Sequence, residues 1–304
     1  MICYQGLGAN LGERENNLRR AIELIKKIPA VKLLRVSSFY ESEPWGVEGQ
    51  PNFINAAIKI SADLEPLALL DELQRIELEL GRVRREHWGA RTIDIDILLI
   101  EGREISSERL TVPHKFLFER DFALIPLKEI FPTLKANLRG DKVFRVQGSP
   151  TDFKFKLIAC VDKNFGLGYK GKLLFRLPED LKNFRRITLG HTIIFGRKTL
   201  ETLPNRQPLD GRRNIVLSRT LEKISGAEVV GSIAELFDVL DVAEDNFVIG
   251  GAEVFNELIP YAAEIFLTVV DAEVPADTFF PNVNEFILRD VKKFGGFEFR
   301  RYTR

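Results

Sequence analysis

The stretch Thr92-Ile93-Asp94-Ile95-Asp96-Ile97-Leu98-Leu99 carries the strongest structural signal in the first half of the chain. Side chains alternate along a β-strand, so Asp94 and Asp96 share one face while the isoleucines share the other. Two carboxylates this close repel each other unless a cation or an arginine lies between them. The pattern therefore predicts a strand over residues 93–100 with one core-facing side and one acidic side.

The segments before this strand have the periodicities of an α+β domain. Apolar residues recur at helical spacing over residues 14–27 and 66–80, and residues 2–7, 31–39 and 53–60 read as strands. With the strand at 93–100, the order is βαββαβ. This order is typical of a ferredoxin-like α+β sandwich.

The second half has a different pattern of apolar segments. Short apolar strands are expected at residues 155–161, 191–196, 214–218, 227–230, 246–250 and 264–270, with helical stretches between them. That alternation predicts an α/β domain with a mostly parallel sheet covered by helices on both faces. The turn formers Gly148-Ser149-Pro150-Thr151-Asp152 separate the halves. We expect domains at 1–147 and 153–304, joined by a linker at 148–152.

Composition narrows the class of protein. The chain has 304 residues, a length that suits two domains, and its 44 basic residues balance its 44 acidic residues. This balance removes the electrostatic reason to expect nucleic acid or an anionic membrane as a partner. Cys3 and Cys160 are isolated, which argues against a disulfide, a zinc site or a thioredoxin-like motif. We expect a cytoplasmic protein that acts on small molecules, with neither a signal peptide nor a membrane span.

Basic side chains surround the acidic strand in the sequence. Upstream lie Arg82, Arg84, Arg85 and Arg91, and downstream lie Arg109, His114 and Arg120. Guanidinium groups beside paired carboxylates can form a phosphate clamp, and carboxylates on a rigid strand suit Mg²⁺ that carries a nucleotide polyphosphate. Asp94 and Asp96 alone are equally compatible with a solvated strand face, so the neighbouring arginines favour the catalytic interpretation.

The first half resembles a known enzyme family in several motifs, from residue 1 to about residue 135. These are Gly8-Ala9-Asn10-Leu11-Gly12, Gln74-Arg75-Ile76-Glu77, Gly81-Arg82-Val83-Arg84, Trp88-Gly89-Ala90-Arg91-Thr92-Ile93-Asp94-Ile95-Asp96 and Val112-Pro113-His114. They are similar to the motifs of 6-hydroxymethyl-7,8-dihydropterin pyrophosphokinase. The resemblance implies transfer of the β,γ-pyrophosphoryl group of ATP to the hydroxymethyl group of the pterin.

The same resemblance implies a role for individual residues. Asp94 and Asp96 would hold two Mg²⁺ ions, and Arg82 and Arg91 would be catalytic, neutralising charge at the transferred group. The implied ATP-binding residues are Gln74, Glu77, Arg84, Arg109, Thr111, His114 and Arg120. The implied pterin-binding residues are Pro44, Trp45, Phe53, Asn55, Trp88 and Phe122.

In the second half, a proline-led helix is expected near residue 178, with Asp180 in its first turn. Taken alone, an acidic residue there is better explained by the helix dipole. The surrounding motifs favour another interpretation. Phe195-Gly196-Arg197-Lys198-Thr199, Leu209-Asp210-Gly211-Arg212-Arg213-Asn214, Val248-Ile249-Gly250-Gly251-Ala252 and Leu267-Thr268 resemble dihydrofolate reductase, over about residues 155–304. That family implies hydride transfer from NADPH to 7,8-dihydrofolate.

This second resemblance also implies residue roles. Asp180 would bind the pterin edge and favour protonation at N5, with Thr268 supporting it through a bridging water. The implied folate-binding residues are Phe184, Leu209, Arg212 and Ile249. The implied cofactor-binding residues are Cys160, Gly168, Gly196, Arg197, Lys198, Thr199, Ser218, Arg219, Gly250 and Gly251. Residues 166–175 would form a mobile lid.

Some positions depart from the family patterns. His87 and Lys115 differ in the first half, Leu174-Phe175 replaces a Pro-Trp pair, and Phe255 replaces a tyrosine. Two alternatives remain: an RNA-binding module on a ferredoxin-like sheet, and a catalytically inactive scaffold. The paired carboxylates on the predicted strand disfavour the first, and the retained Asp94, Asp96 and Asp180 disfavour the second.

Overall fold

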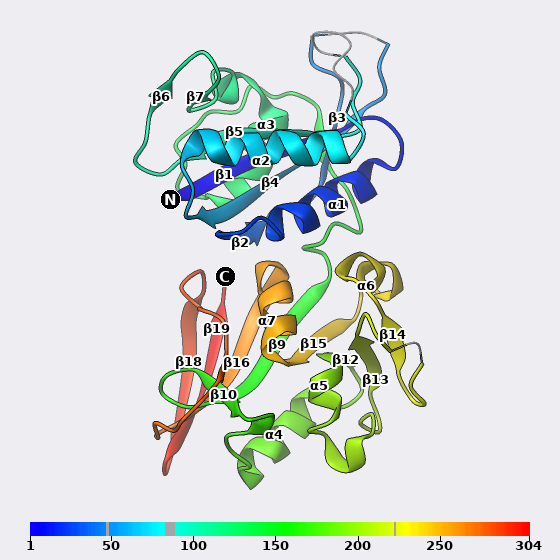
Figure 1. The fold of residues 1–304 in the computed structure, drawn as a ribbon, viewed down its shortest axis with the longest axis vertical. Coiled ribbons are helices and arrows are strands. Elements are labelled where there is room, and N and C mark those ends of the chain that lie inside the picture. Colours follow the sequence, from blue (N-terminus) through cyan, green and yellow to red (C-terminus); the bar gives the residue numbers. More distant parts are fainter. Residues whose placement is uncertain (47–48, 83–88, 222) are drawn as a thin grey trace. The chain divides into compact units, whose positions relative to one another are not determined.

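The computed structural model describes the chain except for residues 47–48, 83–88 and 222, and divides it into two compact units (Figure 1). Unit 1 is Met1–Asp152 and unit 2 is Phe153–Arg304. Four residues that the sequence singles out lie outside the described residues: Arg84, Arg85, His87 and Trp88.

Unit 1 is built on a six-stranded sheet with the order β5-β1-β4-β3-β8, and β2 pairs with β4. All its strand pairs are antiparallel. Its strands are β1 (Ile2–Ala9), β2 (Val31–Val36), β3 (Tyr40–Ser42), β4 (Phe53–Ala62), β5 (Asp94–Ile100) and β8 (Val143–Arg145). A separate short hairpin is formed by β6 (Ile105–Ser106) and β7 (Thr111–Val112).

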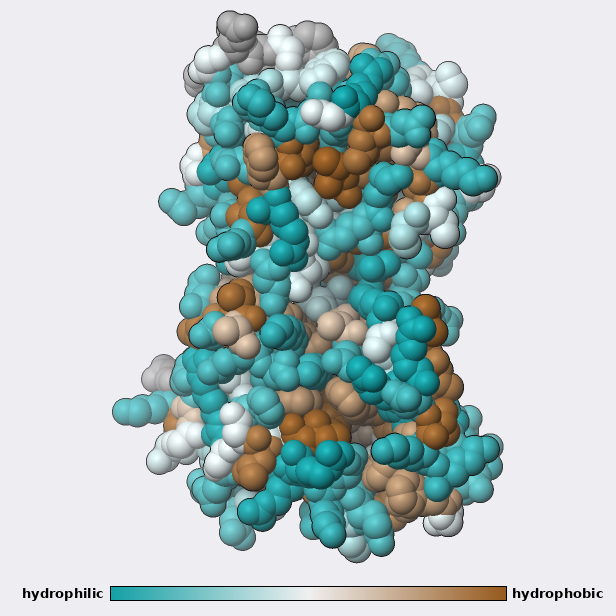
Figure 2. Space-filling model, turned by 180° about the vertical axis from the view of Figure 1, so that it is seen from behind, coloured by the Kyte–Doolittle hydropathy of each residue, from teal (hydrophilic) through white to brown (hydrophobic). Residues whose placement is uncertain are grey.

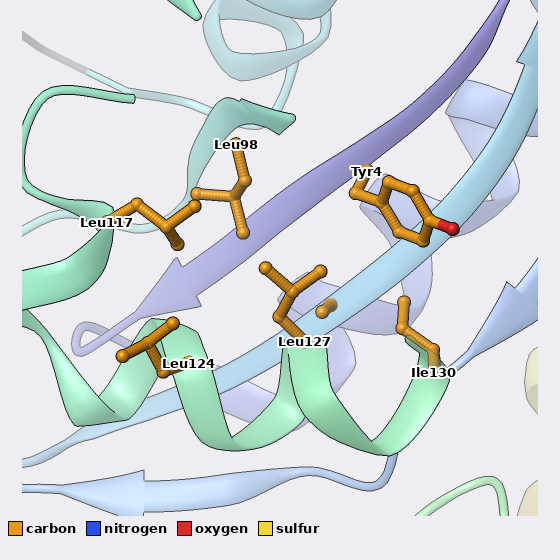
Figure 3. Close-up of a cluster of buried hydrophobic side chains, with 7 residues drawn as sticks. Tyr4, Leu98, Leu117, Leu124, Leu127 and Ile130 are labelled. Carbon is orange, nitrogen blue, oxygen red and sulfur yellow. The ribbon is translucent and has the colours of Figure 1, made fainter. Parts of the chain in front are cut away.

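Helices cover both faces of this sheet (Figure 1). The helix α1 (Arg14–Lys26) buries Leu18, Ala21, Ile22 and Ile25, and α2 (Pro66–Glu79) buries the apolar stripe that the sequence predicts. On the other face, side chains of α3 (Asp121–Ile130) point toward Tyr4 of β1 and Leu98 of β5 (Figure 3). A short 3₁₀ turn, η1 (Leu117–Glu119), leads into α3.

One predicted strand, over residues 31–39, is shorter in the structure. It ends at Val36, and pairing resumes at Tyr40 as β3. The interruption has a chemical cause: the Ser37 hydroxyl accepts a hydrogen bond from the Ala57 N–H at 2.9 Å and donates to the Ser38 carbonyl at 2.7 Å. Serine side chains that bond to the backbone compete with the regular ladder.

The segment predicted as a linker is bonded inside unit 1. Ser149 is fully buried, and its hydroxyl accepts the Phe39 N–H at 2.9 Å. Arg145 donates to the Ser38 hydroxyl at 2.8 Å, and Thr151 lies 2.7 Å from the same hydroxyl. Residues 145–152 are therefore part of unit 1, where their polar side chains bond to Ser38 and Phe39 just before β3.

Unit 2 contains an eight-stranded sheet with the order β14-β13-β12-β15-β9-β16-β19-β18. The pairs from β14 to β16 are parallel and the last two are antiparallel, so the sheet is mostly parallel, as predicted. The strands are β9 (Lys154–Val161), β12 (Thr192–Gly196), β13 (Arg213–Leu217), β14 (Glu228–Val230), β15 (Asp245–Gly250), β16 (Ala262–Val270), β18 (Ile287–Phe294) and β19 (Phe297–Thr303).

The remaining elements of unit 2 surround this sheet. A small second sheet joins β11 (Lys172–Leu173), β10 (Gly166–Tyr169) and β17 (Thr278–Phe279). The helices are α4 (Pro178–Thr188), α5 (Arg197–Leu200), α6 (Ile233–Val239) and α7 (Ala252–Leu258), with 3₁₀ turns η2 (Pro204–Arg206) and η3 (Ile259–Tyr261). One core cluster joins Ile158, Ile193, Phe195, Val216 and Phe247, which come from four adjacent strands.

The surface shown in Figure 2 is mostly hydrophilic, with hydrophobic areas between the polar ones. Among the exposed apolar residues, Ile287, Leu288, Val291 and Phe294 all lie on the edge strand β18. Within the described parts of the chain, no helix combines the length and the apolarity that a membrane crossing requires.

Candidate active sites

A cavity of about 260 Å³ in unit 1 brings together residues from distant parts of the sequence. It is bounded by β1, β4, β5 and the segment around residues 114–123. The sequence-predicted residues on its wall are Pro44, Trp45, Phe53, Asn55, Arg82, Arg91, Asp94, Asp96, His114, Arg120 and Phe122. These basic, acidic and aromatic residues from separate parts of the sequence therefore line one space.

The two carboxylates project from β5 into this cavity. In the ladder with β1, Gly8 lies opposite Asp94 and Gly6 lies opposite Asp96. A Cβ on Gly8 would lie 3.2 Å from the Asn55 side chain, and one on Gly6 would lie 3.2 Å from Leu98. Because these two positions carry no side chain, the part of the cavity over β1, next to the two carboxylates, stays open.

The carboxylates differ in their environment. Arg82 lies 2.6 Å from Asp94, and Arg91 binds the other oxygen of the same carboxylate. Among the described residues, the side chain of Asp96 has no hydrogen-bond or ion-pair partner, although it lines the cavity. Burial, with the charges of Asp94 and Glu77, raises the pKa of Asp96 to about 7.

This donor set fits a hard divalent cation. Mg²⁺ is usually held by one or two carboxylates together with substrate phosphates, rather than by a complete protein cage. Accordingly, the described residues contain no group of three or more His, Cys, Asp or Glu side chains placed to hold a metal. Asp94 and Asp96 supply two oxygen donors on one rigid strand, and a cation would relieve the burial cost of Asp96.

The glycine-rich turn after β1 positions one of the arginines. The Asn10 side chain accepts the Arg91 N–H at 2.7 Å, and the N–H groups of Asn10 and Leu11 both donate to the Arg91 carbonyl. Two segments that are 81 positions apart are thus bonded to each other. The turn at residues 8–12 thereby holds Arg91 beside Asp94.

The other end of the cavity is aromatic. The Arg120 guanidinium lies 4.5 Å from the Trp45 ring centre, 4.7 Å from that of Phe116 and 5.7 Å from that of Phe122. Its Nε is buried without a partner among the described residues. Burial lowers the pKa of Arg120, and the Asp96 and Asp94 charges oppose that shift. Sequence reasoning missed Phe116, which lies one residue after a position that departs from the family pattern.

Some predicted residues lie away from this cavity. Gln74, Arg109 and Thr111 are absent from its described wall; Thr111 is exposed, and Arg109 pairs with Asp71 on the surface. Glu77 is also absent from the wall and is buried at 3% exposure. The lining contains further residues that the sequence did not single out, namely Gly6, Leu7, Ser42, Glu43, Gln50, Ala56, Leu98, Phe116, Leu117 and Ala123.

In unit 2, Asp180 and Thr268 are joined directly, and not through the bridging water that the family resemblance implies. The Thr268 hydroxyl on β16 donates to the Asp180 carboxylate on α4 at 2.5 Å. Burial raises the pKa of Asp180, and this hydrogen bond partly opposes the shift. Cys160 lies opposite Thr268 in the ladder, and burial together with the Asp180 charge raises the pKa of its thiol. The predicted acid is therefore a half-buried group and not a solvated helix cap.

The side chains predicted to contact a folate are anchored in unit 2 by the core cluster and by α4. Phe184, Leu209 and Ile249 are half-buried against the core cluster around Phe195. Arg212 is held by the Thr188 hydroxyl at 2.8 Å and by the Asp210 carbonyl at 2.9 Å. Thr188 was missed by sequence reasoning because it appears as an ordinary residue at the end of a helix.

The glycines predicted for the cofactor lie where β15 and β12 end. The Gly250–Gly251 peptide is cis, and a Cβ on either residue would lie 3.4 Å from the Thr199 hydroxyl. Gly196, Arg197, Lys198 and Thr199 form the adjoining turn into α5. Arg197 pairs with Glu201 and Arg219 is exposed. The residues predicted as a lid, 166–175, form a hairpin whose strand β10 pairs with β17.

Comparison with known proteins divides the chain at the same place. Residues 4–132 match the family model described as 7,8-dihydro-6-hydroxymethylpterin-pyrophosphokinase, and residues 154–295 match the one described as dihydrofolate reductase. A similar curated protein is the 2-amino-4-hydroxy-6-hydroxymethyldihydropteridine pyrophosphokinase of Haemophilus influenzae. It is 48% identical over 130 residues, which cover 43% of this chain and 81% of that protein.

Two further relatives match the same segment. The pyrophosphokinase of the same description from Bacillus subtilis is 48% identical over 129 residues, covering 42% of this chain and 77% of that protein. The Bifunctional protein FolKE of Lactococcus lactis subsp. cremoris is 47% identical over 127 residues, covering 42% of this chain and 36% of that protein. The segment similar to these proteins contains the whole acidic and aromatic cavity.

Proposed function

Because the chain belongs to the 7,8-dihydro-6-hydroxymethylpterin-pyrophosphokinase family through its first half and carries a dihydrofolate reductase domain in its second, we propose that it catalyses two reactions of folate metabolism. The first is Mg²⁺-dependent transfer of pyrophosphate from ATP to 6-hydroxymethyl-7,8-dihydropterin. The second is NADPH-dependent reduction of 7,8-dihydrofolate to 5,6,7,8-tetrahydrofolate. We further propose a ferredoxin-like sandwich for the kinase domain and the cytoplasm as its location.

The observation that carries the kinase proposal is the meeting of two carboxylates, two arginines and an aromatic surface in one cavity. Asp94 and Asp96 would hold Mg²⁺, which, when bound, neutralises phosphate charge. Arg82 and Arg91 would bind the transferred phosphates and stabilise the charge that develops during transfer. Both guanidiniums are already held next to Asp94, beside the proposed cation site.

The aromatic end of the cavity would bind the pterin. Trp45, Phe53 and Phe122 offer ring faces for stacking. Asn55 is held by a hydrogen bond from its amide to the Ser42 hydroxyl at 2.9 Å, which leaves its carbonyl free to read the pterin edge. Arg120 lies in the same aromatic cluster, so its side chain has to move or stack beside the ligand when a pterin enters.

In the reductase, Asp180 is the ionisable residue proposed to contact the pterin ring. Its carboxylate would accept hydrogen bonds from the ring edge and favour protonation at N5. Thr268 orients that carboxylate. NADPH, when bound, supplies the hydride; Gly250, Gly251 and the turn Gly196–Thr199 would let the backbone approach it closely. Arg197, Lys198 and Arg219 would bind its 2′-phosphate, and Cys160, Gly168 and Ser218 would line the same site.

Two assays on the intact chain test the proposal. AMP formation from ATP and hydroxymethyldihydropterin reports the kinase, and dihydrofolate-dependent oxidation of NADPH reports the reductase. Asp94→Asn should abolish only AMP formation, and Asp180→Asn should impair only NADPH oxidation. The activity that each variant retains shows that equal amounts of protein are compared, and the melting temperature of each variant shows whether the altered unit is folded. Absence of either activity in the wild-type chain would refute that half of the proposal.

A further inference from the structure

Glu77 lies beside the kinase site but outside its cavity. It occupies the last turn of α2, and its side chain is buried at 3% exposure. The family resemblance implies a contact with ATP, yet in the structure the carboxylate faces the edge of β5. A buried carboxylate needs strong hydrogen bonds or a charged partner, so its actual contacts indicate what it does.

The first contact is to the backbone between the two acidic residues. β5 is the edge strand of the sheet, and Ile95 separates Asp94 from Asp96. The Ile95 N–H donates to the Glu77 carboxylate at 2.7 Å. An edge strand leaves such groups unpaired, and an unpaired buried N–H is costly. Glu77 therefore replaces the missing neighbouring strand at the point that sets the direction of both acidic side chains.

The second contact is to a catalytic arginine. The Glu77 oxygen that accepts the Ile95 N–H also binds the Arg82 guanidinium, and the same nitrogen of Arg82 lies 2.6 Å from Asp94. Arg82 thus joins the Asp94 carboxylate, which lines the cavity, to the Glu77 carboxylate, which does not. The Arg82 backbone N–H also donates to the Glu77 carbonyl at 2.9 Å, which fixes the start of the arginine segment.

We propose that Glu77 is a positioning residue for the cation site, acting through Ile95 and Arg82 and making no contact with ATP. It fixes the backbone between Asp94 and Asp96, and it shares Arg82 with Asp94. Without its charge, Arg82 would pair with Asp94 alone, and this carboxylate would be a poorer ligand for a divalent cation. The inference rests on the proposed kinase function: Glu77 is the group that keeps Asp94 and Asp96 available to a cation.

The test compares Glu77→Gln and Glu77→Ala with a control on the same helix. Glu79→Gln removes a charge from a side chain that is 51% exposed and pairs only at the surface, with Arg75. Mn²⁺ binding is measured by electron paramagnetic resonance on the full chain with a non-hydrolysable ATP analogue. In addition, kcat and KM for ATP and for the pterin are measured, with reductase activity as the standard for protein concentration and the melting temperature as the check that unit 1 is folded.

Residues that orient metal ligands typically change metal affinity or activity by about 10–100-fold when replaced. We expect Mn²⁺ affinity and kcat to fall by about that factor in both Glu77 variants. The KM for the pterin and the reductase rate should stay unchanged, and Glu79→Gln should match the wild type. Excess Mg²⁺ should partly restore the kinase rate.

Two results would overturn the inference. Unchanged Mn²⁺ affinity with a raised KM for ATP would make Glu77 an ATP contact. A lower melting temperature with unchanged Mn²⁺ affinity and kcat would make it structural only. Glu77→Gln keeps the side-chain size, so it decides the question even where Glu77→Ala does not fold. Because Mn²⁺ binding needs no turnover, failure of the proposed kinase activity leaves this measurement informative.

Discussion

The Thr268 hydroxyl donates a hydrogen bond to the Asp180 carboxylate at 2.5 Å, joining β16 to the first turn of α4. The two residues are 88 positions apart in the chain. Thr268 is itself buried at 4% exposure, so it holds one Asp180 oxygen in a fixed direction. Under the proposed function, the other oxygen would accept a hydrogen bond from the edge of the pterin.

Replacing this carboxylate should impair the reductase in a pH-dependent way. Asp180→Asn should keep NADPH binding but lose about 10²–10⁴-fold in hydride transfer at neutral pH, the usual contribution of a positioned acid or base. The loss should shrink toward acid pH, where solvent protonates N5 unaided. Single-turnover rates from pH 5 to 8 check this, and a small loss independent of pH would reduce Asp180 to a helix cap.

The same variant should be more stable than the wild type at neutral pH. Burial raises the pKa of Asp180 above its ordinary value of 3.8, so the folded state binds the proton more tightly than the unfolded state. The resulting loss of folding stability is absent below about pH 3.8 and grows as the pH rises through the folded-state pKa of Asp180. The difference in melting temperature between Asp180→Asn and wild type should therefore be larger at pH 7 than at pH 3.5.

The control for this measurement is Glu179→Gln, a change at the neighbouring exposed residue in the same helical turn. It alters the interaction with the helix dipole but removes no buried charge, so it should not stabilise the chain at pH 7. A gain of equal size in both variants would attribute the effect to the helix terminus and not to the burial of Asp180.

Removing either acidic residue of β5 should separate the two activities. Asp94→Ala and Asp96→Ala should reduce AMP formation to background, because loss of a metal ligand costs several kcal/mol of charge stabilisation. Dihydrofolate reduction should continue at the wild-type rate. Asp63→Ala, at an exposed position after β4, is the matched control. Near-normal kinase rates in both β5 variants would exclude them as metal ligands.

The segment before unit 2 should matter for the stability of unit 1. Ser149→Ala leaves the buried Phe39 N–H without its hydrogen bond, a loss worth about 1–3 kcal/mol. A fragment of residues 1–147 should accordingly unfold at a lower urea concentration than a fragment of residues 1–152. Equal urea midpoints for the two fragments would show that residues 148–152 add no stability to the kinase unit.

Several features of the fold could be predicted because they depend on local periodicity. The alternation in residues 93–100 predicted that Asp94 and Asp96 share a face, and both line the cavity. The apolar stripe of α2 and the mostly parallel sheet of unit 2 follow from the same kind of pattern. The strand predicted over residues 31–39 was too long, because the bonds of Ser37 to a neighbouring strand do not appear in the apolar pattern.

Residue type and backbone period are enough to predict which chemical groups the protein carries and on which face of each strand or helix they lie. The partners of these groups depend on how distant segments pack. Glu77 lies behind Asp94 and Asp96, Thr188 holds Arg212, and Arg120 lies among the aromatic rings. These contacts join segments that are separated along the chain, and a side chain acquires its role from the charge and burial that such packing creates around it.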